Sequence, residues 1–123
     1  MKDVRILIVD DEPFYRKMLR ELIEKIGFTV VAEAADGREA VRMFLAHRPH
    51  VTIMDIYMPG KNGIDATREM IALNKNANVL TSSASDCASD TQAVLKVGAK
   101  GVIKKPFVAK EIYESVKMVL CGQ

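Results

Sequence analysis

Residues 5–13 have the sequence RILIVDDEP, and this stretch decides the fold. We predict a β-strand at residues 5–9, because residues 6–9 are all apolar, without the polar alternation of a surface strand, which is typical of a strand buried on both faces of a sheet. Pro13 suits the first turn of a helix, and apolar residues then recur at helical spacing up to Ile26, so that Gly27 is expected to end the helix. A buried strand that leads directly into a helix indicates a βα unit.

The same alternation of strand and helix repeats along the chain. Further strands are expected at residues 29–34, 51–55, 78–82 and 102–103, with a turn at Asp36-Gly37. Further helices are expected after this turn, from about Ile64, at about residues 89–97 and at residues 109–120. Leu45 lies on the apolar stripe of the first of these helices, and Leu73 on that of the second. Five βα units are too few for an eight-stranded barrel. We therefore predict an α/β protein, a doubly wound (βα)5 unit with a five-stranded parallel sheet between two helical layers.

Length and composition indicate one folded domain, residues 1–123. With 49% hydrophobic residues, 28% charged residues and a mean hydropathy of +0.04, the chain is neither disordered nor a membrane protein. No apolar run approaches the roughly 20 residues of a membrane span, and no signal peptide is recognisable, so we expect a cytoplasmic protein without membrane contact. Cys87 and Cys121 lie far apart without zinc-site spacing, and we expect both to be reduced thiols.

The net charge of +2 is too small to indicate direct nucleic-acid binding, but its distribution is uneven. Residues 96–123 contain six lysines against two acidic residues. A solvated basic face is the simpler explanation of this surplus, and a docking surface for an acidic partner is the alternative.

Acidic residues collect at the carboxyl ends of two predicted strands, which is the edge where open parallel sheets bind ligands. Asp10 and Asp11 follow the first strand, and Asp55 ends the third. Asp10 or Asp11 alone would be explained as a helix cap, but no helix follows Asp55 closely enough to be capped by it. Because like charges repel, a positive group must lie among these acids. Carboxylates without His or Cys nearby favour Mg²⁺.

Hydroxyl groups and a lysine follow two other strands at the same edge. The fourth strand leads into Thr81-Ser82-Ser83-Ala84-Ser85, and the fifth into Lys104-Lys105-Pro106-Phe107. Either stretch alone would be explained as an ordinary polar loop, but hydroxyls, a cation and a metal together indicate a phosphoryl site. The sequence has no glycine-rich nucleotide-binding loop, so the phosphoryl group must arrive on a donor, and a carboxylate could receive it.

In their order and spacing these motifs closely resemble the receiver domain of two-component response regulators. The resemblance rests on VDDEP at residues 9–13, MDIYMPG at residues 54–60 followed by Gly63, Ser83-Ala84, and Lys105-Pro106-Phe107, and it covers the whole chain. It implies a flavodoxin-like fold with strand order 2-1-3-4-5 and a cis peptide bond between Lys105 and Pro106.

The resemblance also implies a role for each site residue. Asp55 would be the phosphoacceptor, and Ser83 and Lys105 would each bind a phosphoryl oxygen. The donor would be a sensor histidine kinase or a histidine phosphotransfer protein, and the chain would catalyse only its own phosphorylation and dephosphorylation. The ligands of Mg²⁺ would be Asp10, Asp11, Asp55 and the backbone carbonyl of Tyr57.

One position departs from the family pattern. Many members have Tyr or Phe, which moves inward on switching, where this chain has Val102. We therefore expect the signal to pass through the backbone of residues 83–88, towards a face for a downstream protein on the fourth helix, fifth strand and fifth helix. By resemblance, Tyr57 and Ser85 flank the phosphoryl site and tune the loss of phosphate, whereas His47 and His50 are expected on the surface far from it.

We predict a stand-alone receiver of the chemotaxis or phosphorelay type, because no output domain follows residue 123. One alternative is the receiver fragment of a longer DNA-binding response regulator, which the length of the intact gene would test. A second is an aspartate-nucleophile phosphatase, although such enzymes carry Asp-x-Asp where this chain has adjacent aspartates. A third is a flavodoxin, although the Ser/Thr-rich phosphate loop is absent after the first strand.

Overall fold

A computed structural model describes residues 3–84 and 88–121 of the chain. Five parallel strands form one sheet in the order β2-β1-β3-β4-β5, as predicted. Strands and helices alternate along the chain: β1 (Arg5–Val9), α1 (Pro13–Ile26), β2 (Thr29–Ala34), α2 (Gly37–His47), β3 (Val51–Asp55), α3 (Gly63–Leu73), β4 (Val79–Ser83), α4 (Ala88–Lys96), β5 (Gly101–Lys104) and α5 (Ala109–Cys121).

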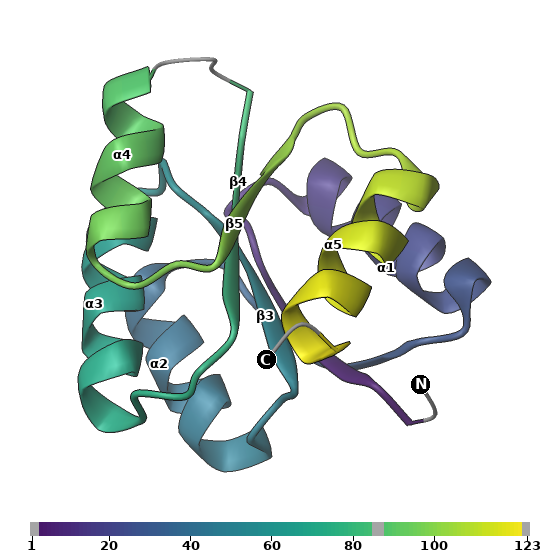
Figure 1. Ribbon diagram of the computed structural model, residues 1–123, viewed down its shortest axis with the longest axis horizontal. Coiled ribbons are helices and arrows are strands. Elements are labelled where there is room, and N and C mark those ends of the chain that lie inside the picture. Colours follow the sequence, from purple (N-terminus) through teal and green to yellow (C-terminus); the bar gives the residue numbers. More distant parts are fainter. Residues whose placement is uncertain (1–2, 85–87, 122–123) are drawn as a thin grey trace.

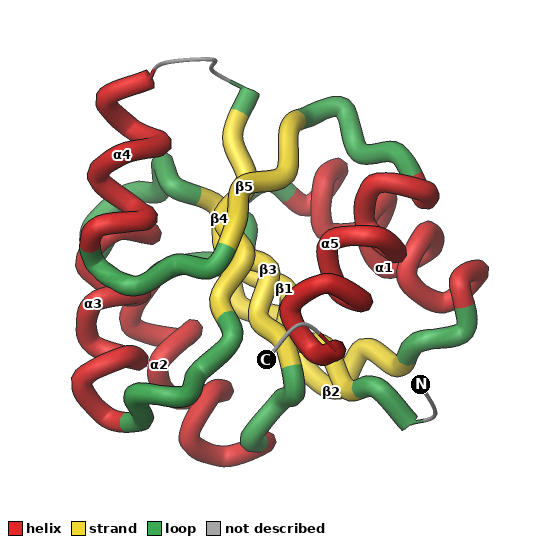
Figure 2. Tube along the Cα trace, in the orientation of Figure 1, coloured by secondary structure: helices red, strands yellow, loops and turns green. Residues whose placement is uncertain are grey.

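The helices cover both faces of the sheet. Figure 1 shows α2, α3 and α4 on the left of the sheet and α1 and α5 on the right. The strands form the central layer between these two groups (Figure 2). Side chains alternate across the pleat, so that Ile6 and Ile8 pack with α1 and α5, while Leu7 and Val9 pack with α2 and α3. The prediction of a doubly wound sheet is therefore confirmed.

The first three strands were predicted to the residue, and the later boundaries move by one or two. The fourth strand is Val79–Ser83 and not residues 78–82, and the fourth helix is Ala88–Lys96 and not residues 89–97. The fifth strand is longer than predicted because Gly101 and Lys104 extend its pairing with β4. The fifth helix ends one residue later, at Cys121.

The helix termini follow from local chemistry. Gly27 ends α1 in the left-handed conformation, with a φ of 106°, as its sequence position predicts. The prediction of a turn at Asp36-Gly37 is wrong, because Asp36 is the N-cap of α2 and Gly37 its first residue. The Asp36 carboxylate accepts a hydrogen bond from the Glu39 amide at 2.8 Å, while the Glu39 side chain accepts one from the Ala35 amide.

Three side chains on the predicted apolar stripes are exposed, and one of them is Phe14, in the first turn of α1, at 64%. Leu45 is 54% exposed and Leu73 is 52% exposed, so the prediction of inward positions is wrong for both. Each lies in the last turns of its helix. The helical period indicates the side to which a residue points, but it does not show whether another element covers that side.

Three smaller features complete the fold. The peptide bond between Lys105 and Pro106 is cis, as the family resemblance implies. Cys121 is an exposed free thiol, whereas Cys87 and Ser85 lie outside the described residues. Within residues 3–84 and 88–121, no helix has both the length and the apolar character of a membrane span.

Candidate functional site

The three aspartates predicted at the strand ends lie together. Asp10 directly follows β1, and Asp55 is the last residue of β3, the neighbouring strand. One carboxylate oxygen each from Asp10, Asp11 and Asp55 lie within 4.8 Å of one another. Asp10 and Asp55 are buried, and Asp11 is half-buried. The parallel register therefore brings two acids of the loop after β1 and one acid at the end of β3 into one cluster.

The role of a helix cap does not explain this cluster. The N-cap of α1 is Glu12, and its side chain makes no capping hydrogen bond. Asp10 Oδ1 accepts a hydrogen bond from the Glu12 amide at 2.9 Å, which forms a local turn before the helix. The other oxygen, Asp10 Oδ2, points into the cluster, where Lys105 approaches it.

Lys105 places a positive charge between two of the aspartates. Its Nζ atom lies 2.9 Å from Asp10 Oδ2 and 3.5 Å from Asp55 Oδ1, and its side chain is only 7% exposed. The same atom lies 4.0 Å from the centre of the Tyr15 ring, which is a cation–π arrangement. A buried lysine in contact with two acids and one aromatic face has little freedom to leave the cluster.

Burial and like charges change the acid–base behaviour of the site. Burial and the nearby Asp10 carboxylate raise the pKa of Asp55 to about 6, although Lys105 opposes this increase. Burial lowers the pKa of Lys105, but its contact with Asp10 and the charge of Asp55 outweigh burial, so the pKa is raised overall. Lys105 therefore stays charged at neutral pH, whereas Asp55 strongly favours a counter-charge or a proton.

The other predicted site residues come from the same edge of the sheet. Ser83 is the last residue of β4 and is buried, and it follows Ser82, the register partner of Asp55. Its carbonyl oxygen accepts a hydrogen bond from the Lys105 amide at 3.1 Å, which joins the ends of β4 and β5. Tyr57 lies two residues after Asp55, with its side chain exposed.

Gly63 holds the loop after β3 against the strand end. Its amide donates a hydrogen bond to the Ile56 carbonyl at 2.9 Å. A Cβ atom at this position would lie 2.0 Å from the backbone oxygen of Asp55, so only glycine fits here. The loop that carries Tyr57 is therefore closed directly onto the backbone of Asp55.

The residues of the cluster fit a magnesium ion. All candidate ligands are hard oxygen atoms, and they come from a compact set of carboxylates. Asp10 Oδ2 is buried and, within the described residues, has Lys105 as an ion-pair partner without a well-directed hydrogen bond. Three carboxylates against one ammonium group leave an excess of negative charge, which a divalent cation would balance.

Two residues of the site were not predicted from the sequence. Tyr15 supplies the aromatic face beneath Lys105, and Arg16 donates a hydrogen bond to the Asp10 carbonyl at 2.7 Å. Both lie in the first turns of α1, where their residue types are ordinary for an amphipathic helix. Nothing in their sequence positions relative to Asp10 indicates that they contact the site instead of lying on the surface.

The histidines do not belong to the site. His47 ends α2, and His50 precedes β3, so both lie at the edge of the sheet where the strands begin. His50 Nδ1 accepts a hydrogen bond from the Arg5 amide at 2.9 Å, also at this edge. Their predicted separation from the acidic cluster agrees with the fold.

The raised pKa of Asp55 predicts a pH-dependent stability. Because this pKa exceeds the value of about 3.9 in an unfolded chain, the contribution of Asp55 to stability falls as the pH rises from about 4 to 6. In metal-free buffer, Asp55→Asn should therefore raise the free energy of unfolding by about 2 to 3 kcal/mol at about pH 7.5, and by much less near pH 4. Urea unfolding followed by circular dichroism measures both values.

Asp36→Asn is the matched control for this substitution. Asparagine caps a helix about as well as aspartate, so this variant should differ from the wild type by less than about 0.5 kcal/mol. Equal stabilities of Asp55→Asn and the wild type at neutral pH would show that burial of the Asp55 charge does not destabilise the fold.

Comparison with known proteins identifies similar chains. The sequence model of the response regulator receiver domain matches residues 6–117. The chemotaxis protein CheY of Thermotoga maritima is 41% identical over 115 residues, which cover 94% of this chain and 96% of that protein. The transcriptional regulatory protein DegU of Brevibacillus brevis is 37% identical over 97% of this chain, but only 51% of its own length is matched.

The fold is shared with solved structures. The crystal structure of the CheX–CheY–BeF3–Mg²⁺ complex from Borrelia burgdorferi contains a chain that is 32% identical, with a TM-score of 0.92. The match covers 97% of this chain and 90% of that chain.

Proposed function

This chain belongs to the response regulator receiver domain family, and we propose that Asp55 is the phosphoryl acceptor of this two-component signalling switch. The observation that carries the proposal is the position of its carboxylate. Asp55 is buried at the end of β3, beside two further aspartates and 3.5 Å from the ammonium group of Lys105. A nucleophilic carboxylate and charge-stabilising groups are what phosphoryl transfer requires.

The proposed reaction moves one phosphoryl group without a redox step. An oxygen of the Asp55 carboxylate forms a bond to phosphorus, the bond from phosphorus to the imidazole nitrogen of the donor breaks, and that nitrogen keeps the electron pair. Lys105 supplies positive charge for the oxygens of the transferred group, and Ser83 supplies a hydroxyl donor. Hydrolysis of the resulting acyl phosphate returns Asp55 to its free form.

The clustered carboxylates of Asp10, Asp11 and Asp55 would hold Mg²⁺. The Tyr57 backbone carbonyl would join them, as the family resemblance implies. When bound, the ion would supply positive charge for the phosphoryl oxygens and would balance the excess of carboxylates. The CheY chain of the Borrelia burgdorferi complex was crystallised with Mg²⁺ and BeF3, which supports this cofactor for a chain of the same fold.

We further assign the chain to the chemotaxis type of receiver, in the cytoplasm, with a histidine kinase or a phosphotransfer protein as donor. The CheY of Thermotoga maritima supports this assignment because the match covers 96% of its length. DegU favours the alternative of a receiver within a longer transcriptional regulator, since this chain corresponds to about half of it.

The proposed output face consists of α4, β5 and α5. Ile56 directly follows Asp55 and packs with Val94 of α4 and Ala99 in a small separate core, against which Val102 of β5 also packs. A change at Asp55 can therefore reach α4 and β5 through one side chain. The expected route through residues 83–88 includes residues 85–87, which lie outside the described residues.

Phosphoryl acceptance is tested with a small donor. Acetyl phosphate and Mg²⁺ should add one phosphoryl group to the wild-type chain, measured as intact mass, and Asp55→Asn should not gain it. Asp36→Asn, which changes a carboxylate outside the site, should be labelled like the wild type. Equal labelling of Asp55→Asn would contradict the assignment, and steady turnover of aryl phosphates would favour a phosphatase instead.

Metal binding should stabilise the fold. Because Mg²⁺ would bind only the folded arrangement of the three carboxylates, saturating Mg²⁺ should add about 2 to 3 kcal/mol at a hundredfold excess over its dissociation constant. Asp11→Ala should lose most of this increase. Thermal unfolding by circular dichroism with and without chelator measures it, and a melting temperature indifferent to millimolar Mg²⁺ would exclude the site.

A further inference from the structure

A cavity of about 490 Å³ opens at the edge of the sheet where the strands begin, opposite the acidic cluster. The last turns of α2 and α3 form two of its walls, and Leu120 of α5 contributes a third. Phe44 and Ala77 are buried and form apolar lining. The proposed phosphoryl chemistry uses none of these residues.

The apolar walls of the cavity are not explained by the core of the protein. Leu45 and Leu73 line the cavity, and each exposes more than half of its side chain to solvent. Both lie on the apolar stripes of their helices, yet no described element covers them. Exposed leucines that line the same cavity are a feature of interaction sites more than of free surfaces.

His50 and Asn74, which line the cavity, offer hydrogen-bond donors. His50 Nδ1 accepts the Arg5 amide, so the neutral ring carries its proton on Nε2 and can donate it. The side-chain oxygen of Asn74 accepts the Asn76 amide at 2.9 Å, which leaves the Asn74 amide nitrogen as a donor. Among the described residues that line the cavity, none is acidic.

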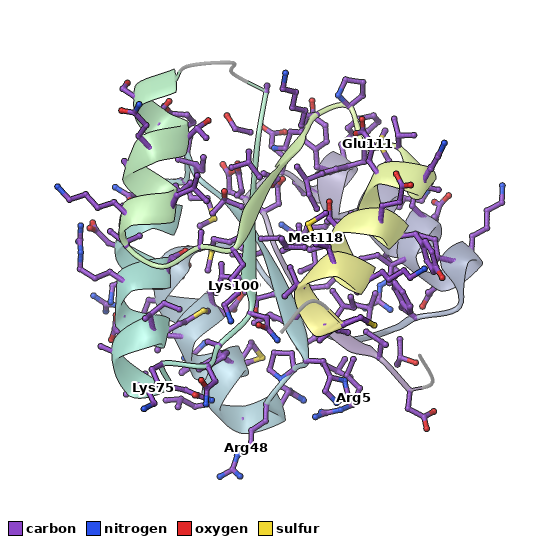
Figure 3. All side chains as sticks on the ribbon, viewed as in Figure 1. Arg5, Arg48, Lys75, Lys100, Glu111 and Met118 are labelled. Atoms are coloured by element: carbon purple, nitrogen blue, oxygen red, sulfur yellow. The ribbon has the colours of Figure 1, made fainter. Side chains whose placement is uncertain are left out.

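Arg48 adds a positive charge to the lining of the cavity. It is the C-cap of α2 and has a φ of 45°, a left-handed conformation that arginine adopts at some energetic cost. Its side chain points away from the body of the molecule along the lower edge in Figure 3, where Arg5 and Lys75 also lie. The Arg5 guanidinium is already bound to the carbonyls of His47 and Arg48, so Arg48 is the cation that the described lining residues offer to a ligand.

We propose that this cavity docks a partner protein through an acidic segment that presents an aliphatic side chain beside a carboxylate. The aliphatic side chain would enter between Leu45 and Leu73, and the carboxylate would face Arg48 and the His50 Nε2 donor. Charge complementarity favours an acidic segment, because the described residues that line the cavity include the cation Arg48 and hydrogen-bond donors but no acid. The half-exposed leucines favour a peptide over a small molecule, since small-molecule sites enclose most of their ligand.

Selection from a displayed random peptide library tests the proposal without knowledge of the partner. The intact wild-type chain is the bait, and Leu73→Glu is used for counter-selection. Enriched peptides should carry Leu, Ile or Met next to Asp or Glu. No enrichment over the counter-selected background, or enrichment of peptides without acidic residues, would overturn the proposal.

Matched variants then locate the binding. Arg48→Ala and Leu73→Ala should each weaken the affinity of an enriched, fluorescently labelled peptide by about tenfold or more, measured by anisotropy. Arg42→Ala, on the same helix as Leu45, and Leu95→Ala, on α4, remove exposed side chains outside the cavity and should change the affinity by less than about twofold. Equal weakening by the control variants would overturn the assignment to this cavity.

Two further measurements test whether the cavity binds something other than an acidic segment of a partner protein. If octanoate bound the cavity while the enriched peptides did not compete with it, the site would belong to small amphiphilic carboxylates. If the chain formed a dimer in sedimentation experiments that Leu73→Ala abolished, a second copy would be the occupant. Either result would overturn a separate acidic partner, and circular dichroism verifies that each variant is folded.

Discussion

Replacement of Lys105 by methionine is expected to destabilise the metal-free protein at neutral pH by about 3 kcal/mol or more. Its ammonium group lies 2.9 Å from Asp10 and 3.5 Å from Asp55, and both carboxylates are buried. Methionine retains much of the aliphatic stem but leaves these two charges without their cation. Removal of one partner from a buried ion pair is far more destabilising than removal of a surface charge. Urea unfolding in the presence of chelator measures this loss.

Lys104→Met is the matched control, because Lys104 is the neighbouring residue on β5 and its side chain is exposed. It should change the free energy of unfolding by less than about 1 kcal/mol. Addition of Asp55→Asn to Lys105→Met should recover part of the lost stability, since one of the uncompensated charges is then removed. Equal stabilities of the Lys104 and Lys105 variants would show that Lys105 does not compensate the acidic cluster.

Gly63→Ala is expected to destabilise the fold by at least about 3 kcal/mol, even though only one methyl group is added. The new Cβ atom would lie 2.0 Å from the Asp55 carbonyl oxygen and 2.8 Å from the Ile56 Cα atom. These are backbone atoms of a buried strand end, so they cannot rotate away. The hydrogen bond from the Gly63 amide to the Ile56 carbonyl would be lost when the loop moves outward.

Gly60→Ala separates this steric effect from backbone strain. Gly60 has a φ of 72°, and a Cβ atom there would meet no atom within 4 Å. Its replacement should therefore cause only the conformational penalty of about 1 to 2 kcal/mol. Urea unfolding followed by circular dichroism compares the stabilities of the two variants. If Gly63→Ala were as stable as Gly60→Ala, the close approach of residue 63 to the Asp55 backbone would not limit the stability of the fold.

The sequence allowed accurate prediction of the first three strands, whose bounds were placed to the residue. β1 and β3 are mostly apolar and buried, whereas β2 alternates between buried and more exposed residues, and both patterns indicate a strand. The end of β4 moved because Ser83 has no marked strand preference but pairs with Lys104 of β5. Leu45 and Leu73 were misplaced because helical periodicity does not show where a neighbouring element ends.

Much of the candidate site followed from a single rule of topology. The carboxyl ends of parallel strands share one edge, so Asp10, Asp55 and Lys105 could be placed together without knowledge of distances. The contacts of Tyr15 and Arg16 could not be predicted, since they depend on how α1 is rotated against the sheet. The closeness of Gly63 to Asp55 likewise depends on the path of one loop.

The most direct test of Asp55 as phosphoryl acceptor is chemical location of the phosphoryl group on the chain. The wild-type protein is phosphorylated with acetyl phosphate and Mg²⁺, reduced with borohydride, which converts an acyl phosphate into an alcohol, and digested for mass spectrometry. We predict reduction at Asp55 alone, and none when Mg²⁺ is withheld. A reduced carboxyl group at Asp10 or Asp11, or a stable phosphate on Ser83, His47 or His50 in place of Asp55, would contradict the proposed function.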